Sequence, residues 1–205
     1  DVYAGFIVGF DSDTADIFQK QIDFIQDSGI VVALVNILKA PPGTDLYDRM
    51  VREGRLHEVD LDGREGDADF VSIMGDEVLY RGYKRVVKYI YAPKNLYERT
   101  RNFLRNHETH GPMILSSRAL VNDVWTYFKT LYYLGIQDSG RMYYWKLLVW
   151  TLLNRPSLFP VAVELWIITY HYRKIYEDDA AFMEMGSDRA EPQVAVEQKT
   201  FAASL

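Results

Sequence analysis

The sequence predicts an α+β fold that is mostly α, with a short parallel β-α-β unit followed by a bundle of about five helices. Two near-continuous apolar segments, residues 2–10 and 30–38, flank a segment whose apolar residues have helical spacing. Strands buried on both faces carry such apolar runs, and a helix between them is the crossover of a parallel pair. From residue 76 onward, apolar residues recur every three or four positions, which predicts helices.

The first three elements follow from local signals. Residues 2–10 predict a strand buried on both faces, and residues 14–27 predict an amphipathic helix. Asp13 or Thr14 is expected to cap that helix, because either side chain can accept a hydrogen bond from the first turn. Residues 30–38 predict the second strand.

The two predicted strands make an incomplete sheet. A parallel sheet normally has more strands and has both faces covered. Because the sequence begins inside or just before the first strand, we expect upstream strands to lie outside it. We therefore expect the two strands either to pair with each other and expose an edge, or to be completed by a second copy of the chain.

The rest of the chain divides by composition. Thr44 is expected to cap a short helix that contains Met50 and ends at Gly54. The acidic, glycine-containing segment that follows predicts a linker. We therefore predict a β-α-β-α unit at 1–56, a linker at 57–75, a helical domain at 76–180 and a loosely ordered tail at 181–205.

Capping residues, prolines and glycines bound the helices of the helical domain. In the first helix, the residues expected to face inward are Leu79, Tyr83, Val86, Val87 and Ile90. The predicted helices run from Asp76 to the Ala92-Pro93 step, from Pro93 to His107, from Ser116 or Ser117 to Gly135, from Ser139 to the residue before Pro156, and from Ser157 to Asp178.

Composition excludes several classes of protein. The chain has 205 residues, 48% of them hydrophobic, and a net charge of −6, which argues against nucleic-acid binding as the main role. It contains no cysteine, so it holds no disulfide, thiol nucleophile or cysteine-ligated cluster of its own. We find no signal-peptide pattern and no apolar run near the ~18–20 residues of a membrane span, and we expect a cytoplasmic location.

The glycine-containing strand raises the main functional question. A dinucleotide fingerprint needs its glycines between strand and helix, but Gly5 lies inside the predicted strand. A phosphate loop needs a Gly-Lys step, which is absent here. A calcium loop that starts at Asp11 needs a Gly at loop position six and a Glu at position twelve, and the sequence has neither. Two interpretations stay open: strand packing with helix capping by Asp13, or a strand end where Ile7 and the bare backbone of Gly9 face a flat ring.

Other polar and aromatic residues each have a structural and a functional interpretation. Asn36 is either a satisfied buried amide or a ligand contact, and Lys39 reaches an anion or solvent. Glu164 is either a core-helix carboxylate paired with an Arg or a carboxylate that lines a substrate cavity. His107 and His110 make no convincing metal set. The aromatic residues that could line an apolar pocket or merely pack are Tyr132, Tyr133, Tyr143, Tyr144 and Trp145.

Three ordered motifs carry a resemblance to a known family. The stretch GFIVGFDSD, Gly5 to Asp13, resembles the Gly-x-Ile-x-Gly-x-x-x-Glu pattern on the fifth barrel strand of radical S-adenosylmethionine enzymes. PGTDLY, Pro42 to Tyr47, resembles the turn after their sixth strand. The segment 80–99 is similar to the start of the helical domain that follows the barrel in the cobalamin-binding subgroup, which includes magnesium-protoporphyrin monomethyl ester oxidative cyclases and hopanoid C-2 methylases.

The resemblance implies a C-terminal fragment of such an enzyme, covering the last part of the barrel and the helical domain. It places Gly5, Ile7 and Gly9 beside the adenine of S-adenosylmethionine, with Leu38 at the neighbouring strand end. Asp13 stands where the family has Glu. The three-cysteine motif for the [4Fe–4S] cluster and the cobalamin domain are absent from this chain, so no catalytic residue, metal site or cofactor of its own is expected, and the cofactors belong to the parent protein.

The leading hypothesis is therefore a catalytically incomplete fragment of a radical enzyme that methylates or cyclises an apolar substrate, with the rest of the barrel, or a second copy, as partner. The alternative is a non-enzymatic helical interaction or regulatory module. A third hypothesis is a lipid-facing surface of the aromatic helices. The residues expected to contact lipid headgroups are Arg81, Lys84, Arg85 and Lys88. The same four residues also fit a plain solvated helix face.

Overall fold

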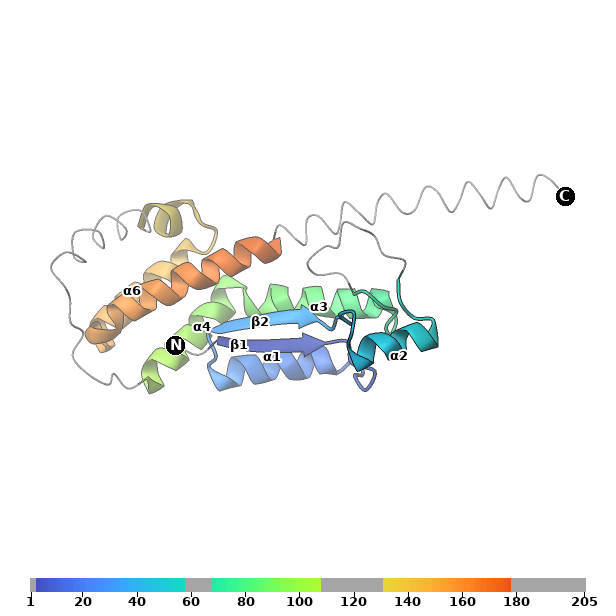
Figure 1. Ribbon diagram of the computed structural model, residues 1–205. Helices are drawn as coiled ribbons and strands as arrows, with labels where there is room; N and C mark the ends of the chain where they lie inside the picture. Colours follow the sequence, from blue (N-terminus) through green and yellow to red (C-terminus); the bar gives the residue numbers. More distant parts are fainter. Residues whose placement is uncertain (1–2, 58–67, 108–130, 178–205) are drawn as a thin grey trace, which may run out of the picture. The chain divides into compact units, whose positions relative to one another are not determined.

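The computed structural model describes residues 3–57, 68–107 and 131–177. It confirms a mostly helical α+β fold in which two parallel strands precede the helices (Figure 1). The described residues to Tyr170 belong to one compact unit, and residues 171–177 belong to another. The elements are β1 (Tyr3–Val8), α1 (Ile17–Ser28), β2 (Val32–Ile37), α2 (Asp45–Glu53), α3 (Asp76–Ile90), α4 (Pro93–Asn106), the π-helix η1 (Tyr133–Gln137), α6 (Arg141–Asn154) and the 3₁₀ turn η2 (Pro156–Leu158), and residues 159–177 are helical.

The strands β1 and β2 pair with each other, which was one of the two expected arrangements. They run parallel in a register that joins Tyr3 to Val32 and Val8 to Ile37. The expectation that β1 is buried on both faces is wrong, because burial alternates along it. Tyr3 is 52% exposed and Ile7 46% exposed, whereas Val8 is fully buried. Within the described residues, helices therefore cover one face of this two-stranded sheet and leave the other face open.

The covered face packs against α1 and α3. Phe6 of β1 meets Phe24 of α1 edge to face, with ring centroids 6.0 Å apart. The two helices approach closely because α3 has Gly82 at their contact: a Cβ at this position would lie 2.2 Å from the Phe18 ring of α1. Phe18 is almost fully buried. The residues expected to face inward on α3 are all buried: Leu79, Tyr83, Val86, Val87 and Ile90.

A buried arginine joins four segments of the fold. Arg99 of α4 is 1% exposed. Its Nη1 donates to Gln26 Oε1 of α1 at 2.6 Å and to the Ile90 carbonyl that ends α3 at 3.0 Å. Its Nη2 donates to the Val31 carbonyl, just before β2, at 3.0 Å. One guanidinium thus fixes α4 against the ends of α1 and α3 and the start of β2.

Most helix boundaries follow the expected caps. Thr44 Oγ1 accepts from the Tyr47 amide at the start of α2, and Gly54 ends that helix in the left-handed conformation. The capping role expected of Asp13 or Thr14 is wrong, because α1 begins only at Ile17. The expected helix end at Gly135 is also wrong, since Gly135 lies inside η1.

Several predicted features lie outside the described residues. They are the start of a helix at Ser116 or Ser117, residues 58–67 of the predicted linker, and the predicted tail at 181–205. Residues 68–75, which belong to the described part of that linker, contact the segments around the strand ends. Leu56 and Phe70 form an antiparallel bridge, and Phe70 packs with Ala40 and Met50 in a small core. Residues 68–75 therefore belong to the packed structure around the strand ends.

We predict that Gly82→Ala destabilises the chain, because the added methyl group must displace the Phe18 ring. Overpacking costs about 1–3 kcal/mol, and the better helix propensity of Ala returns up to about 1 kcal/mol, so we expect a net loss of about 1–2 kcal/mol. Urea unfolding of Gly82→Ala, Phe18→Leu and the double variant measures this. A cost for Gly82→Ala that is the same in the Phe18→Leu variant as in the unmodified chain would contradict the close contact.

Candidate functional site

The open face of the β1–β2 sheet carries part of the predicted site. Gly5 pairs with Leu34, and Ile7 pairs with Asn36. A Cβ at Gly5 would meet nothing within 4 Å, so a side chain or ligand group can approach this position of the strand. Asn36 is exposed, which makes the buried-amide interpretation wrong. Gly5, Ile7 and Asn36 thus form a surface with one apolar and one amide side chain over bare backbone.

The carboxyl ends of the strands carry the other two predicted residues. Gly9 follows β1 with φ of 100°, a left-handed conformation that favours glycine. Asp13 Oδ2 accepts from the amides of Gly9 and Phe10 at 2.9 and 3.0 Å. Leu38 follows β2, is half-buried and donates its amide to the Val8 carbonyl at 2.8 Å. Asp13 therefore orders the turn after β1 instead of capping α1.

An ion-pair network, which the sequence did not predict, lies beside this edge. Asp11 accepts from Arg55 through both carboxylate oxygens, at 2.8 and 3.2 Å, and from Arg49 Nη2 at 2.7 Å. Arg55 also donates to the Val71 carbonyl and lies over the Phe70 ring, 5.5 Å from its centroid. The hydrogen bonds from Arg55 lower the pKa of Asp11 below its ordinary value of 3.8. The network ties the turn after β1 to α2 and to residues 70–71.

Asp69 and His57 complete the polar contacts near the strand ends. Both carboxylate oxygens of Asp69 accept from the Ala40 amide at 2.9 Å, and the Asp69 carbonyl accepts from the His57 amide. His57 Nε2 lies 3.3 Å from Asp76 Oδ2, at the start of α3. Among the described residues, no three histidine or carboxylate side chains gather as metal ligands. These groups therefore hold the segments around the strand ends together.

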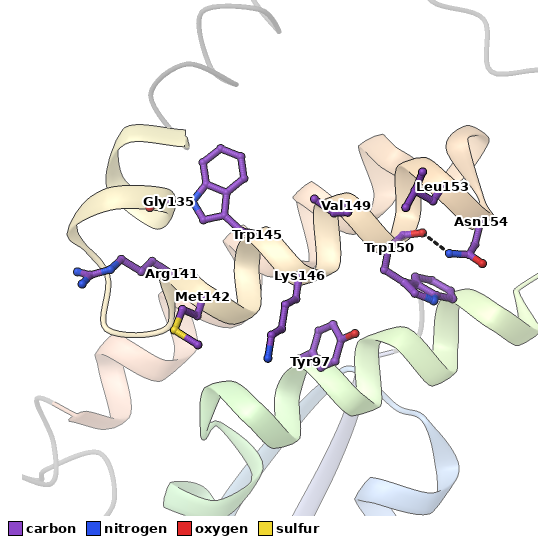
Figure 2. A pocket seen from close by; sticks show the side chains of 10 residues that line it. All are labelled: Tyr97, Gly135, Arg141, Met142, Trp145, Lys146, Val149, Trp150, Leu153 and Asn154. Carbon is purple, nitrogen blue, oxygen red and sulfur yellow. Dashed lines mark hydrogen bonds between the residues drawn. The ribbon is translucent and has the colours of Figure 1, made fainter.

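A second hollow, the α6 groove, lies on the exposed side of α6 with α4 at one edge (Figure 2). It has a volume of about 700 Å³. Trp145 lies in it and donates its indole N–H to the Gly135 carbonyl at 3.0 Å. The residues that line it are Tyr97, Gly135, Arg141, Met142, Trp145, Lys146, Val149, Trp150, Leu153 and Asn154. The groove is apolar and aromatic, with two cations and no carboxylate among these residues.

The residues that the sequence offered as the lining of a pocket in the helical domain do not lie together in the structure. Trp145 lines the groove, whereas Tyr144 is buried at 1% exposure. Glu164 is exposed, so it is not a buried carboxylate of the core. It is not among the residues that line the groove, and its place at a substrate cavity stays a prediction. The His107 ring stacks near the Phe103 ring, with centroids 4.9 Å apart, and His110 lies outside the described residues. The sequence missed Met142, Val149 and Leu153, because their helical spacing is equally typical of a buried core.

Comparison with known families gives a match over most of the helical part. The domain of unknown function DUF4070 matches residues 44–182. The chain belongs to the DUF4070 family. The match begins at Thr44, the cap of α2, and includes α3, α4 and α6. The open face of β1 and β2 lies outside the matched residues, and the α6 groove lies inside them.

One curated relative supports the resemblance found in the sequence. The hopanoid C-2 methylase of Rhodopseudomonas palustris (strain TIE-1) is 28% identical over 151 residues. The aligned region covers 71% of this chain, and the chain spans 28% of the length of that relative. No solved structure matches the chain significantly. The relation to this methylase is distant, and it concerns one part of a longer protein.

We predict that Asp11→Asn lowers stability in a pH-dependent way. Because the folded-state pKa of Asp11 is lowered, its ion pairs stabilise the fold above the ordinary carboxyl pKa of about 4 and are lost as the pH falls below it. Discounted for partial exposure, we expect a loss of about 1–2 kcal/mol at neutral pH that shrinks at acidic pH, as the carboxylate becomes protonated in the folded chain. Urea unfolding at neutral and at acidic pH measures it. The control is Asp23→Asn on α1, whose exposed carboxylate accepts from Gln19, and an equal effect of the two variants would contradict the account.

Proposed function

We propose that this chain is the C-terminal part of a radical S-adenosylmethionine enzyme, in which β1 and β2 form part of the barrel wall. The proposal rests on the parallel pair of β1 and β2, because the helices that the structure describes cover one face of this pair and leave residues on its other face exposed. In a barrel of parallel strands, helices cover the outside, the inward face of each strand turns to the interior, and ligands bind at the carboxyl ends of the strands. The open face of Gly5, Ile7 and Asn36 has the features of such an inward face.

The residues present fit the adenine side of S-adenosylmethionine. Gly5 lets a ligand group approach the strand, and the half-exposed Ile7 offers an apolar side chain to a flat ring. Gly9 keeps the strand end in a conformation held by Asp13, so Asp13 acts by ordering the turn. When bound, S-adenosylmethionine and its iron–sulfur cluster supply the radical chemistry. This chain supplies binding surface only, since it has no cysteine to hold the cluster.

The relative favours methylation over oxidative cyclisation for the whole protein, because it is named a hopanoid C-2 methylase. We therefore propose that the parent protein methylates an apolar substrate and binds cobalamin, as the resemblance implies for this subgroup. The helical domain would then cap the barrel and contribute to the choice of substrate.

The test uses the longer polypeptide that this proposal requires. We expect Gly5→Val and Ile7→Asp to weaken S-adenosylmethionine binding at least tenfold, about 1.4 kcal/mol, because each change places a branched or charged group where the ring is to lie. Iron content should be unchanged. Calorimetric titration measures the affinity, and the chain of residues 1–205 by itself should bind weakly or not at all.

The control is Val51→Asp, a change at a similarly exposed apolar residue on α2. It should leave the affinity within about twofold of the unmodified protein, since Val51 is not among the residues proposed to contact the ring. Unchanged affinity in the Gly5 and Ile7 variants would overturn the proposed site. A reading frame without an upstream Cys-x-x-x-Cys-x-x-Cys motif would overturn the proposed family.

A further inference from the structure

The helix α6 carries large apolar side chains on both its buried and its exposed side. One side is buried and carries Tyr144, Leu147, Leu148 and Thr151. The opposite side is exposed: Met142 is 64% exposed and Leu153 79% exposed, with Trp145 and Val149 between them in one stripe. A helix of this kind normally contacts a second apolar environment, because an exposed stripe of large side chains is costly in water. The stripe therefore marks a docking surface.

Among the described residues, the charged side chains that line the groove or lie over the Trp150 ring are all cations. Arg141 and Lys146 of α6 line the groove, and Figure 2 shows their side chains leaving the same helix as Met142 and Trp145. Arg101 and Arg105 of α4 lie over the Trp150 ring, at 6.0 and 5.8 Å from its centroid. The helix α6 contains no Asp or Glu. This local cationic surface contrasts with the net charge of −6 of the chain.

Aromatic rings complete the pattern. Lys146 lies 5.1 Å from the centroid of the Tyr143 ring, and Trp145 is 45% exposed beside it. Exposed apolar residues, tryptophan and tyrosine rings and flanking Arg or Lys are the composition of helices that lie in the plane of a membrane interface. With 14 residues, α6 is about 21 Å long, too short for a hydrocarbon core of about 30 Å. No helix in the described ranges is long and apolar enough to span a bilayer.

We propose that the α6 face, made of Met142, Trp145, Val149 and Leu153 with the cations Arg101, Arg105, Arg141 and Lys146, docks on an anionic lipid bilayer. The helix lies in the interface with its apolar stripe toward the acyl chains and its cations among the headgroups. This proposal moves the lipid contact away from α3, where Arg81 pairs with Glu77 and Arg85 donates to Gln19. The inference does not depend on the radical chemistry proposed above.

The test is sedimentation of the 205-residue chain with vesicles of phosphatidylcholine, with or without phosphatidylglycerol. We expect binding to the anionic vesicles that weakens as salt is raised, and several-fold weaker binding to neutral vesicles. Val149→Glu with Leu153→Glu should reduce binding to the anionic vesicles at least tenfold, because both carboxylates would enter the acyl region. Circular dichroism checks that this variant keeps its helix content.

A charge-matched pair of variants locates the contact. Arg141→Glu with Lys146→Glu should lower binding to anionic vesicles at least tenfold, whereas Arg81→Glu with Lys84→Glu, the same change in net charge on α3, should leave it within about twofold. Equal losses in the two variants would overturn the proposal. So would an absence of binding to anionic vesicles at low salt. A dimer in solution that dissociates in the Val149 and Leu153 variant, without vesicle binding, would assign the α6 face to protein contact and overturn it too.

Discussion

The buried guanidinium of Arg99 is the constraint on which the arrangement of helices around the strands depends. Burial lowers the pKa of Arg99 to about 10, so the group is still charged near neutral pH. A buried charge is tolerated where it is hydrogen-bonded, and Arg99 donates through Nη1 and Nη2 to the carbonyls of Ile90 and Val31 and to Oε1 of Gln26. Its buried Nε has no hydrogen-bond partner among the described residues. The Ile90 carbonyl ends α3, where the helix dipole favours a cation.

This junction explains why one face of the sheet is covered and the other is not. Because Arg99 joins the start of β2 to the ends of α1 and α3, it holds these helices to one side of the strands. Tyr91, directly after α3, also joins the helices to the strands, because its hydroxyl donates to the Ala33 carbonyl of β2 at 3.0 Å. The open face and the α6 face are two exposed surfaces of the same chain, and we propose that each contacts a group outside this chain. For the open face we propose further strands and a cofactor, and for the α6 face a lipid surface.

The sequence predicted the features that depend on neighbours in the chain. The periodicity of α3 identified its buried residues, and the sequences around Thr44 and Gly54 identified the bounds of α2, because these signals act over three or four positions.

The features that the sequence did not predict depend on distant partners. Asp11 and Arg55 are 44 positions apart, and Arg99 and Val31 are 68 apart, so no local pattern joins them. Asp13 lies four positions from both Gly9 and Ile17, the first residue of α1, and only the conformation of the turn decides which of them its carboxylate contacts. Likewise, the apolar spacing of α6 does not distinguish a buried face from an exposed one, which is why Leu153 was not recognised.

The central claim is that β1 has a further strand neighbour in the parent protein. Hydrogen exchange of a peptide that spans Tyr3–Val8 tests this most directly, when measured in this chain alone and in the longer polypeptide, with α3 as the reference segment. The account predicts slower exchange in β1 of the longer polypeptide and unchanged exchange in α3. Equal exchange of β1 in the two proteins would contradict it.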